Sequence, residues 1–241
     1  MIKELVKRIV LGKRYSSETF TKYLRSRGVR IGEDVTFFVP SKITVDEIYP
    51  WMISIGNHVR ITEGCKILSH DFAWSVPKTM GGAVLGASGR VEIGNNVFIG
   101  MDSIICRNVS IGENVIIGAG SVVTKDCQPN SVYAGNPARR ISSIEDFINK
   151  RTALQDCEAV ELVREYYHKY KQKPDKYAVG EYFMLFTNVD KCREFQSALD
   201  VCKNPDDSIE YMRKHPAIYD RYDAFVEEAL KEQSEGSDWN V

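Results

Sequence analysis

The sequence predicts a mainly β fold, a parallel β-helix flanked by short N-terminal helices and an α-helical C-terminal extension. The first observation is that a large residue, apolar in all but one case, recurs at every sixth position in two series. A chain with this period climbs in short parallel segments, each of which turns one apolar residue inward before a corner. The series are Ile31, Phe37, Ile43, Tyr49, Ile55, Ile61 and Ile67, followed by Ile93, Ile99, Ile105, Ile111, Ile117 and Val123.

The second observation is a break between the two series. Ile93 follows Ile67 by 26 positions, where four six-residue repeats need 24. Residues 72–90 hold no convincing repeat, and residues 80–89 are rich in glycine, which is typical of a loop. We therefore expect residues 72–90 to project from the column as a loop excursion. Its base carries the run Ser69-His70-Asp71.

The third observation is an uneven distribution of charge, which the overall net charge of −1 conceals. Residues 1–30 contain nine Lys/Arg and two Glu, a net charge of +7. Residues 31–141 are close to neutral, and residues 142–241 contain fourteen basic and twenty-one acidic residues, a net charge of −7. These ranges predict three domains, which are an N-terminal helical cap, the β-helix and a helical C-terminal extension.

Two short helices are predicted in residues 1–30. The first has apolar residues at helical spacing, and the second begins at Ser16 or Ser17 as N-cap and ends at Gly28. The first helix also carries Lys3, Lys7 and Arg8. Two interpretations remain open. Its apolar face covers the open end of the column, or this basic amphipathic helix makes a peripheral contact with an anionic membrane.

The period changes at about Ile141, where a helical pattern begins. It continues through Lys171 and ends before Pro174. Residues 182–186 form a compact apolar patch, and helices are predicted near 192–202 and 208–231, with a frayed tail from Glu235 to Val241. The acidic residues of these helices are interpreted as a solvated face over an apolar one.

The cysteines and the hydropathy of the sequence indicate the cellular compartment. The six cysteines show no metal-binding spacing, nothing resembles a secretion signal, and no apolar stretch has the length to span a bilayer. We therefore expect a cytoplasmic protein with reduced thiols, no metal site and no nucleic-acid partner.

Residues 31–141 resemble the hexapeptide-repeat acyltransferases. Within that family they are most similar to the galactoside, maltose and xenobiotic O-acetyltransferases, and especially to the acetyltransferases of surface-polysaccharide synthesis. The resemblance rests on the hexads together with the loop after His70 and three runs in a fixed order. The runs are 93–100 (IGNNVFIG), 117–126 (IGAGSVVTKD) and 134–139 (AGNPAR).

The resemblance implies a left-handed parallel β-helix with three hexads per coil, so that residues 18 apart stack on one face. It also implies a homotrimer with acetyl-CoA bound between neighbouring subunits. Small residues would let the pantetheine arm approach the backbone, and basic residues would bind its phosphates. The positions that match the cofactor-binding residues of the family are Phe98, Gly100, Met101, Gly118, Ala119, Thr124, Lys125 and Arg139.

One of these positions departs from the family pattern, because several relatives have tryptophan where this chain has Phe98. Arg107 precedes Lys125 by 18 positions and is a further candidate for contact with the phosphates. Solvated surface is the alternative for both of these cations.

His70 matches the catalytic histidine of the family. Transfer of an acyl group to a hydroxyl needs a base for the hydroxyl proton, and the ordinary pKa of histidine suits that task. For Asp71 three roles remain open, which are orienting His70, binding acceptor hydroxyls and capping the loop. Trp74 either stacks on a sugar ring or anchors the loop. The other three histidines are interpreted as structural.

The predicted function is acetyl transfer from acetyl-CoA to a saccharide hydroxyl, by direct attack in a ternary complex with His70 as general base. N-acylation of an amino sugar and xenobiotic acetylation are the close alternatives. A serine O-acetyltransferase fits less well because the loop lacks the Gly-Thr-Gly-Lys stretch of that family. A zinc carbonic anhydrase would need three histidine ligands, and only two histidines lie within the repeats. A purely structural β-helix is the remaining alternative.

Overall fold

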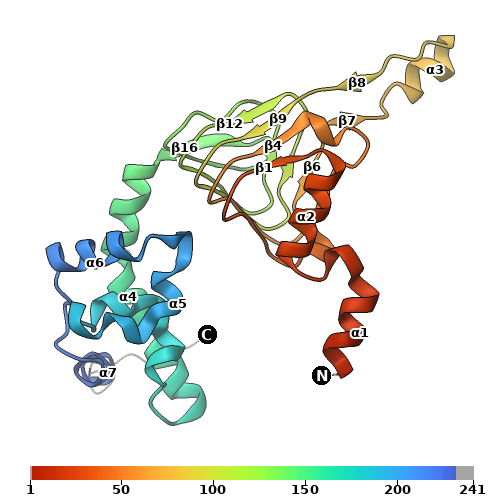
Figure 1. The fold of residues 1–241 in the computed structure, drawn as a ribbon. Helices are drawn as coiled ribbons and strands as arrows, with labels where there is room; N and C mark the ends of the chain where they lie inside the picture. The colour runs from red at the N-terminus through yellow and green to blue at the C-terminus, as the bar shows by residue number, and fades with distance from the viewer. Residues whose placement is uncertain (1, 232–241) are drawn as a thin grey trace. The chain divides into compact units, whose positions relative to one another are not determined.

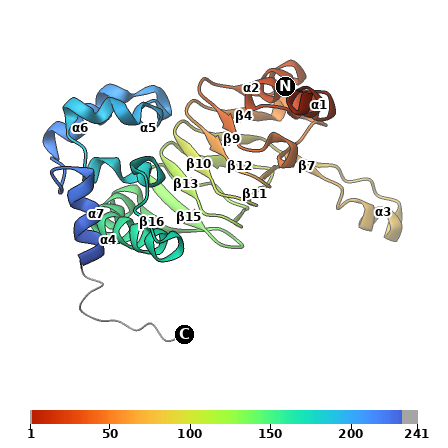
Figure 2. The same cartoon turned by 90° about the horizontal axis from the view of Figure 1, so that it is seen from below.

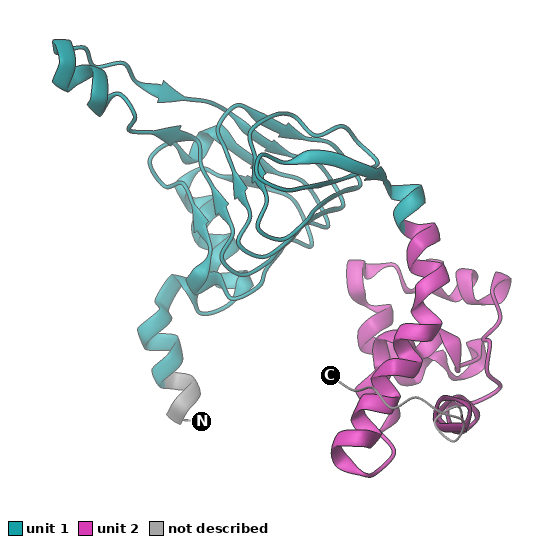
Figure 3. Cartoon of the chain, turned by 180° about the vertical axis from the view of Figure 1, so that it is seen from behind, with its two compact units in different colours: residues 1–147 teal, residues 148–241 magenta. Residues whose placement is uncertain are grey.

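The computed structural model describes residues 2–231, with side chains from residue 6 onward. The chain forms two compact units, residues 1–147 and residues 148–241 (Figure 3). The first unit contains the β strands, and the second is helical.

The first unit is a parallel β-helix whose coils pass in turn through three sheets (Figures 1 and 2). Sheet A contains β1 (Arg30–Ile31), β4 (Ile53–Ile55), β9 (Val91–Ile93) and β12 (Val109–Ile111). Sheet B contains β2 (Thr36–Phe37), β5 (Arg60–Ile61), β10 (Val97–Ile99), β13 (Val115–Ile117), β15 (Ser131–Ala134) and β16 (Arg139–Ser143). Sheet C contains β3 (Thr44–Val45), β6 (Lys66–Ile67), β11 (Ile104–Ile105) and β14 (Val122–Val123).

The register confirms the predicted coil of three hexads between Ile93 and Val123. In all three sheets the stacked apolar residues there are 18 positions apart, with Ile93 on Ile111, Ile99 on Ile117 and Ile105 on Val123. The last coil is shorter, because Ile117 stacks on Tyr133, 16 positions later. These side chains are buried and form the core of the column. The apolar residue of each hexad therefore fills the interior, as the period predicts.

The first coil differs from the predicted pattern. Ile31 pairs with Ile55 and Phe37 pairs with Ile61, each 24 positions away rather than 18. The extra residues are taken up in part by the 3-10 helices η2 (Pro40–Lys42) and η3 (Pro50–Met52). The prediction that Tyr49 occupies a stacked position of the column is therefore wrong, because Tyr49 lies in the irregular segment before η3.

Asparagine side chains stabilise the corner between sheets A and B. Asn96, Asn114 and Asn130 have positive φ angles of 53°, 55° and 55°, a conformation that asparagine tolerates better than most residues. Each side-chain amide donates to the next in the row, with both N···O distances at 2.8 Å. The corners are thus built from residues suited to a left-handed backbone conformation.

The second N-terminal helix covers the end of the column. Helix α2 (Ser17–Arg27) begins with a capping box at Ser16 and ends at Gly28, whose φ of 107° is left-handed, and both ends confirm the prediction. Its residues Phe20 and Leu24 are fully buried in the core of the column. Of the two predicted helices it is therefore α2 that closes the column.

The first N-terminal helix, α1 (Ile2–Leu11), differs from the expectation that its apolar face covers the column. Val6, Ile9 and Val10 are exposed to solvent. The short 3-10 helix η1 (Gly12–Arg14) links α1 to α2. In Figure 1, α1 extends away from the coils.

The predicted excursion contains a helix and a two-stranded ribbon. Strand β7 (His70–Asp71) pairs antiparallel with β8 (Ala87–Ser88), and α3 (Ser75–Gly81) lies between them. Figure 1 shows this segment projecting from the column, as the break in the repeat predicts. His70 lies at its base.

The second unit has its own apolar core of aromatic and aliphatic side chains. The predicted long helix is α4 (Ile144–Tyr170), and the apolar patch at 182–186 contributes Phe183, Leu185 and Phe186 to the core. The predicted tail from Glu235 to Val241 lies outside the described residues. The remaining elements are η4 (Lys176–Leu185), η5 (Val189–Phe195), α5 (Gln196–Leu199), η6 (Val201–Lys203), α6 (Pro205–Lys214) and α7 (Tyr222–Lys231).

Two further features concern the whole described chain. All six cysteines are free. No helix within residues 2–231 combines the length and the apolarity needed to cross a membrane.

Candidate functional site

The predicted base, His70, is hydrogen-bonded to a buried carboxylate. Its Nδ1 donates to Oδ2 of Asp46, which follows β3 in the neighbouring coil. An imidazole whose Nδ1–H is held by a carboxylate presents the lone pair of Nε2 to its surroundings. Nε2 has no hydrogen-bond partner among the described residues. The structure therefore leaves the basic nitrogen of His70 available.

The Asp46 carboxylate is held by several donors at once. Oδ1 accepts from the backbone N–H of Ile48 at 2.9 Å, and Oδ2 accepts from the N–H and hydroxyl of Ser69 at 3.0 and 2.7 Å. Burial raises the pKa of Asp46, but the hydrogen bonds from Ile48, Ser69 and His70 outweigh burial and lower that pKa below its ordinary value. The carboxylate is therefore ionised at neutral pH and fixed in orientation.

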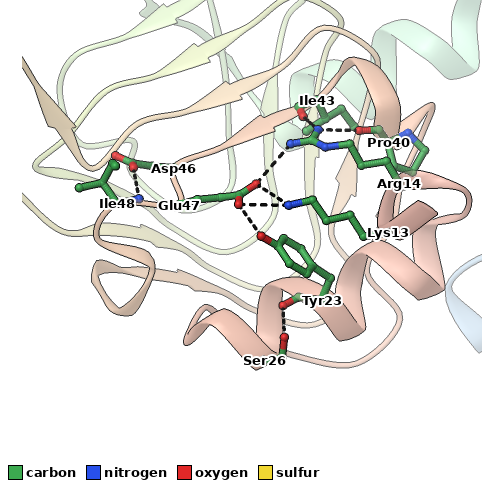
Figure 4. A network of polar contacts seen from close by, with 9 residues as sticks. All are labelled: Lys13, Arg14, Tyr23, Ser26, Pro40, Ile43, Asp46, Glu47 and Ile48. Atoms are coloured by element: carbon green, nitrogen blue, oxygen red, sulfur yellow. Dashed lines mark hydrogen bonds and ion pairs between the residues drawn. The ribbon is translucent and has the colours of Figure 1, made fainter. Parts of the chain in front are cut away.

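A network at the N-terminal helices holds the segment that carries Asp46 (Figure 4). Glu47, the next residue, accepts from Lys13 at 3.3 Å, from Arg14 at 3.5 Å and from the hydroxyl of Tyr23. Arg14 also donates to the backbone carbonyl of Pro40 at 3.0 Å. The η1 segment and α2 are thereby connected to the chain on both sides of β3, next to the partner of His70.

Aromatic rings surround His70. Its ring packs edge to face against Tyr49 and Phe72, with centroid distances of 5.3 and 5.0 Å. Trp51 extends the contact beyond Tyr49, and Trp74 extends it beyond Phe72, at 5.7 and 6.1 Å. We refer to Trp51, Tyr49, Phe72 and Trp74 as the aromatic row. Trp51 and Phe72 are exposed, so the row presents apolar ring surface to solvent beside the imidazole.

Asp71, which the sequence also placed at the site, has no hydrogen bond to His70 among the described contacts. Its carboxylate accepts from Nε of Arg107 at 2.8 Å and from the N–H of Ala73 at 3.0 Å. The hydrogen bonds from Arg107 and then Ala73 lower the pKa of Asp71. Of the three roles left open by the sequence, these bonds correspond to fixing the loop base. Arg107, a candidate for phosphate contact, is engaged in the same ion pair.

The predicted cofactor-binding residues fall at two different corners of the column. One group lies at the corner between sheets B and C, where Gly100 stacks below the segment of Gly118 and Ala119. A Cβ on Gly100 would lie 2.5 Å from the backbone nitrogen of Ala119, so close packing of the coils alone requires glycine there. Met101 and Arg139 are exposed at this corner, and Phe98 is exposed on the adjoining edge of sheet B.

Thr124 and Lys125 lie at the other corner, between sheets C and A. This is the corner at which His70, Asp71 and Arg107 are also found. One whole face of the coil, roughly 15 Å wide, separates the two corners. A single protomer therefore does not bring the glycine corner and His70 together.

The two predicted phosphate-binding cations are available. Lys125 and Arg139 are both exposed, and neither forms an ion pair with a described carboxylate. In the described part of the chain, no three His, Cys, Asp or Glu side chains gather in a way that could hold a metal ion.

Sequence reasoning missed three contributors to the site. The sequence does not identify Asp46 as the partner of His70, nor Ser69 as a donor to Asp46, nor Tyr49 as a neighbour of His70. The signal for Asp46 was its place one residue after a strand that stacks on the strand preceding His70. The irregular length of the first coil obscured that relation.

Comparison with protein families and known proteins gives consistent matches. The family of bacterial transferase hexapeptide repeats (six repeats) matches residues 90–125. Protein CapG of Staphylococcus aureus is 48% identical over 128 residues, which cover 53% of this chain and 73% of CapG.

Solved structures of two acetyltransferases are also similar. A maltose O-acetyltransferase from Clostridium difficile 630 is 28% identical with a TM-score of 0.41, over 58% of this chain and 81% of that protein. A galactoside acetyltransferase in complex with coenzyme A is 29% identical with a TM-score of 0.43, over 60% of this chain and 82% of that protein.

Proposed function

The chain belongs to the hexapeptide-repeat transferases, and on that basis we propose that it transfers an acetyl group from acetyl-CoA to a hydroxyl of a saccharide. The observation that carries the proposal is the pair of His70 and Asp46 at the base of the excursion, with Nε2 of His70 available. The column is proposed to be left-handed, as in the family that it resembles.

In the proposed reaction His70 acts as the general base. Nε2 takes the proton of the acceptor hydroxyl as its oxygen forms a bond to the thioester carbonyl carbon of acetyl-CoA. The carbon–sulfur bond then breaks, the coenzyme A thiolate leaves, and it takes up the proton held on Nε2, which returns His70 to its neutral form. Asp46 holds Nδ1–H and stabilises the positive charge that develops on the imidazole, which supports catalysis without direct contact with substrate.

The donor is proposed to bind at the corner between sheets B and C of a neighbouring subunit. Gly100, Met101, Gly118 and Ala119 would face the pantetheine arm, with Phe98 beside it. Arg139 at the same corner would face the nucleotide and phosphates, together with Thr124 and Lys125 at the His70 corner of the adjoining subunit. Because one protomer keeps this corner away from His70, a homotrimer with its active sites between subunits supplies both halves of each site.

The acceptor is proposed to be a saccharide because of the aromatic row. A sugar ring has an apolar face of C–H groups and a rim of hydroxyls, and it packs through that face on aromatic rings. Phe72 presents such a ring against His70, and Trp51 presents another beyond Tyr49, so a bound sugar would bring a hydroxyl toward Nε2. The aromatic row supports a sugar acceptor more than a small amine, because a small amine would leave the exposed rings uncovered.

Acetyl-CoA consumption measured against hydroxylated sugars, amino sugars, nucleotide-linked sugars and small antibiotics tests this function. We expect turnover with at least one hydroxylated saccharide, and an O-acetyl ester in the product by mass spectrometry. An amide product would overturn O-acetylation. Absence of coenzyme A binding by calorimetry would overturn the transferase assignment itself.

Subunit complementation tests the position of the site between protomers. His70→Ala removes the base, and Ala119→Trp blocks the donor corner. Suppose that each site takes His70 from one chain and the donor corner from its neighbour. Random assembly of equal amounts of the two variants then restores about a quarter of the wild-type activity, because one pairing in four supplies both intact halves. Mixing His70→Ala with a chain that carries both changes restores none. An inactive first mixture, with trimers shown by light scattering, would place each site within one protomer.

A further inference from the structure

The first helix carries an apolar stripe that the described structure leaves uncovered. Val6, Ile9 and Val10 have the i, i+3, i+4 spacing that places them on one face of α1, and their exposed fractions are 52%, 72% and 75%. None of the α1 side chains that the structure describes belongs to the buried core of the column, whose end is closed by Phe20 and Leu24 of α2. The stripe is therefore not needed to complete the fold.

Basic residues border this stripe. The charged groups of Lys7 and Arg8 lie over the ring of Tyr15, at 5.8 and 5.9 Å from its centroid. Neither forms an ion pair with any carboxylate that the structure describes. The surrounding residues 1–30 carry nine basic and two acidic side chains. An exposed apolar stripe beside cations that have no carboxylate partner among the described side chains is the pattern of a helix that lies in the headgroup region of a membrane.

The positive charge beside the stripe favours one binding partner for the apolar face of α1 over another. Two copies of α1 placed face to face would bring Lys7 and Arg8 toward like charges, which disfavours a contact between two α1 helices. Anionic lipid headgroups match these cations, and the acyl chains below them match the stripe.

We propose that α1 binds the surface of an anionic lipid bilayer, parallel to the membrane plane. Val6, Ile9 and Val10 enter the boundary between headgroups and acyl chains, and Lys7 and Arg8 contact lipid phosphates.

The attachment of α1 transmits this docking to the column. Directly after α1, Lys13 and Arg14 are fixed by Glu47, and Arg14 also bonds the carbonyl of Pro40 (Figure 4). A docked α1 therefore holds the β-helix at the bilayer through a structured connection. The inference does not depend on the chemistry of the site, because α1 lies outside it.

Vesicle sedimentation of the full-length protein tests the proposal. One set of vesicles is phosphatidylcholine alone, and the other contains phosphatidylcholine and phosphatidylglycerol. We expect the wild type to sediment with the anionic vesicles, and less so as salt is raised. Lys7→Glu/Arg8→Glu should lower the partition constant by ~30-fold or more. Ile9→Ser/Val10→Ser should lower it by about tenfold or more.

The matched control is Val201→Ser/Ile218→Ser, which removes two exposed apolar side chains from the second unit. Its partition constant should equal that of the wild type. Circular dichroism shows whether each variant is folded.

Three results would overturn the proposal. They are equal partitioning of the wild type and both α1 variants, equal binding of the wild type to neutral and anionic vesicles, and a change of oligomer mass in Ile9→Ser/Val10→Ser without a change in vesicle binding. The last result would assign the stripe to a contact between copies of the chain.

Discussion

Two histidines in the column form the same pair with an aspartate, and their surroundings differ. His58 contacts Asp34 through Nδ1 at 2.9 Å, and His70 contacts Asp46 through Nδ1, with the aspartate 24 positions before the histidine in both cases. Asp34 also accepts from Arg60 at 2.7 Å, whereas the other donors to Asp46 are the neutral groups of Ser69 and Ile48. The side chain of His58 is 41% exposed and that of His70 is 14% exposed.

This difference distinguishes two otherwise similar His–Asp pairs. The guanidinium of Arg60 neutralises the charge of Asp34, so little of that charge acts on the imidazole of His58. The charge of Asp46 acts chiefly on His70, because no described cation pairs with it. His70 also adjoins the aromatic row, whereas no aromatic contact of His58 is found in the described structure. We therefore assign His58 a structural role.

The largest predicted effect separates the two histidines. His70→Ala should lower kcat by ~100-fold or more, because the variant lacks the proposed base for the acceptor proton. His58→Ala should change kcat by less than about twofold. Steady-state acetyl-CoA consumption measures both, with coenzyme A binding as the check that each variant keeps its donor site. Similar losses in the two variants would contradict the comparison.

The next effect separates the two aspartates. Asp46→Asn should lower kcat by about tenfold or more, because a neutral amide cannot stabilise the imidazolium that forms on His70. Asp34→Asn should leave kcat near the wild-type value but lower the free energy of unfolding by about 1–3 kcal/mol, because Arg60 loses a charged acceptor.

Urea unfolding and steady-state kinetics on the same samples measure the two effects. The account would be contradicted if Asp34→Asn were the inactive variant and Asp46→Asn the active one, because the roles of the two His–Asp pairs would then be reversed.

The smallest effect concerns the pH dependence of stability. Burial raises the pKa of Asp34, but the hydrogen bonds from Arg60 and His58 outweigh it, so that the pKa of Asp34, like that of Asp46, is lowered by folding. A carboxyl whose pKa is lowered by folding stabilises the fold above its unfolded pKa of about 3.9, and that contribution is lost as the pH falls through the folded pKa.

Each Asp→Asn variant should therefore lose less stability than the wild type between pH 7 and pH 3, as measured by the unfolding midpoint. An identical acid dependence in the variants and the wild type would show that neither carboxylate is stabilised as the structure indicates.

The later coils of the fold were predictable, and the first coil was not. From Ile93 to Val123 one apolar residue per hexad fills one interior position, so the period gives the register once three hexads per coil are taken from the family resemblance. Before Ile55 the chain inserts 3-10 turns at Pro40 and Pro50, and these change the stacking distance from 18 to 24 residues. A constant six-residue period does not account for such an insertion. For that reason the sequence wrongly predicts that Tyr49 stacks in the column.

The candidate site was predictable to the same extent. His70 was predicted because it lies at the base of the excursion and matches the catalytic histidine of the family that the sequence resembles. Its partner Asp46 was not, because their contact depends on how the first coil stacks on the second. Gly100 and Gly118 were aligned correctly by the 18-residue spacing, but only the order of the sheets shows that they lie at a different corner from His70.

The central claim is that His70 and Asp46 act as one unit, and a double-mutant cycle tests it most directly. It compares kcat/KM of the wild type, His70→Ala, Asp46→Asn and the double variant with the best saccharide acceptor. If Asp46 acts only through His70, the double variant should match His70→Ala within about twofold, although Asp46→Asn alone costs about tenfold or more. Losses that multiply in the double variant would contradict the account.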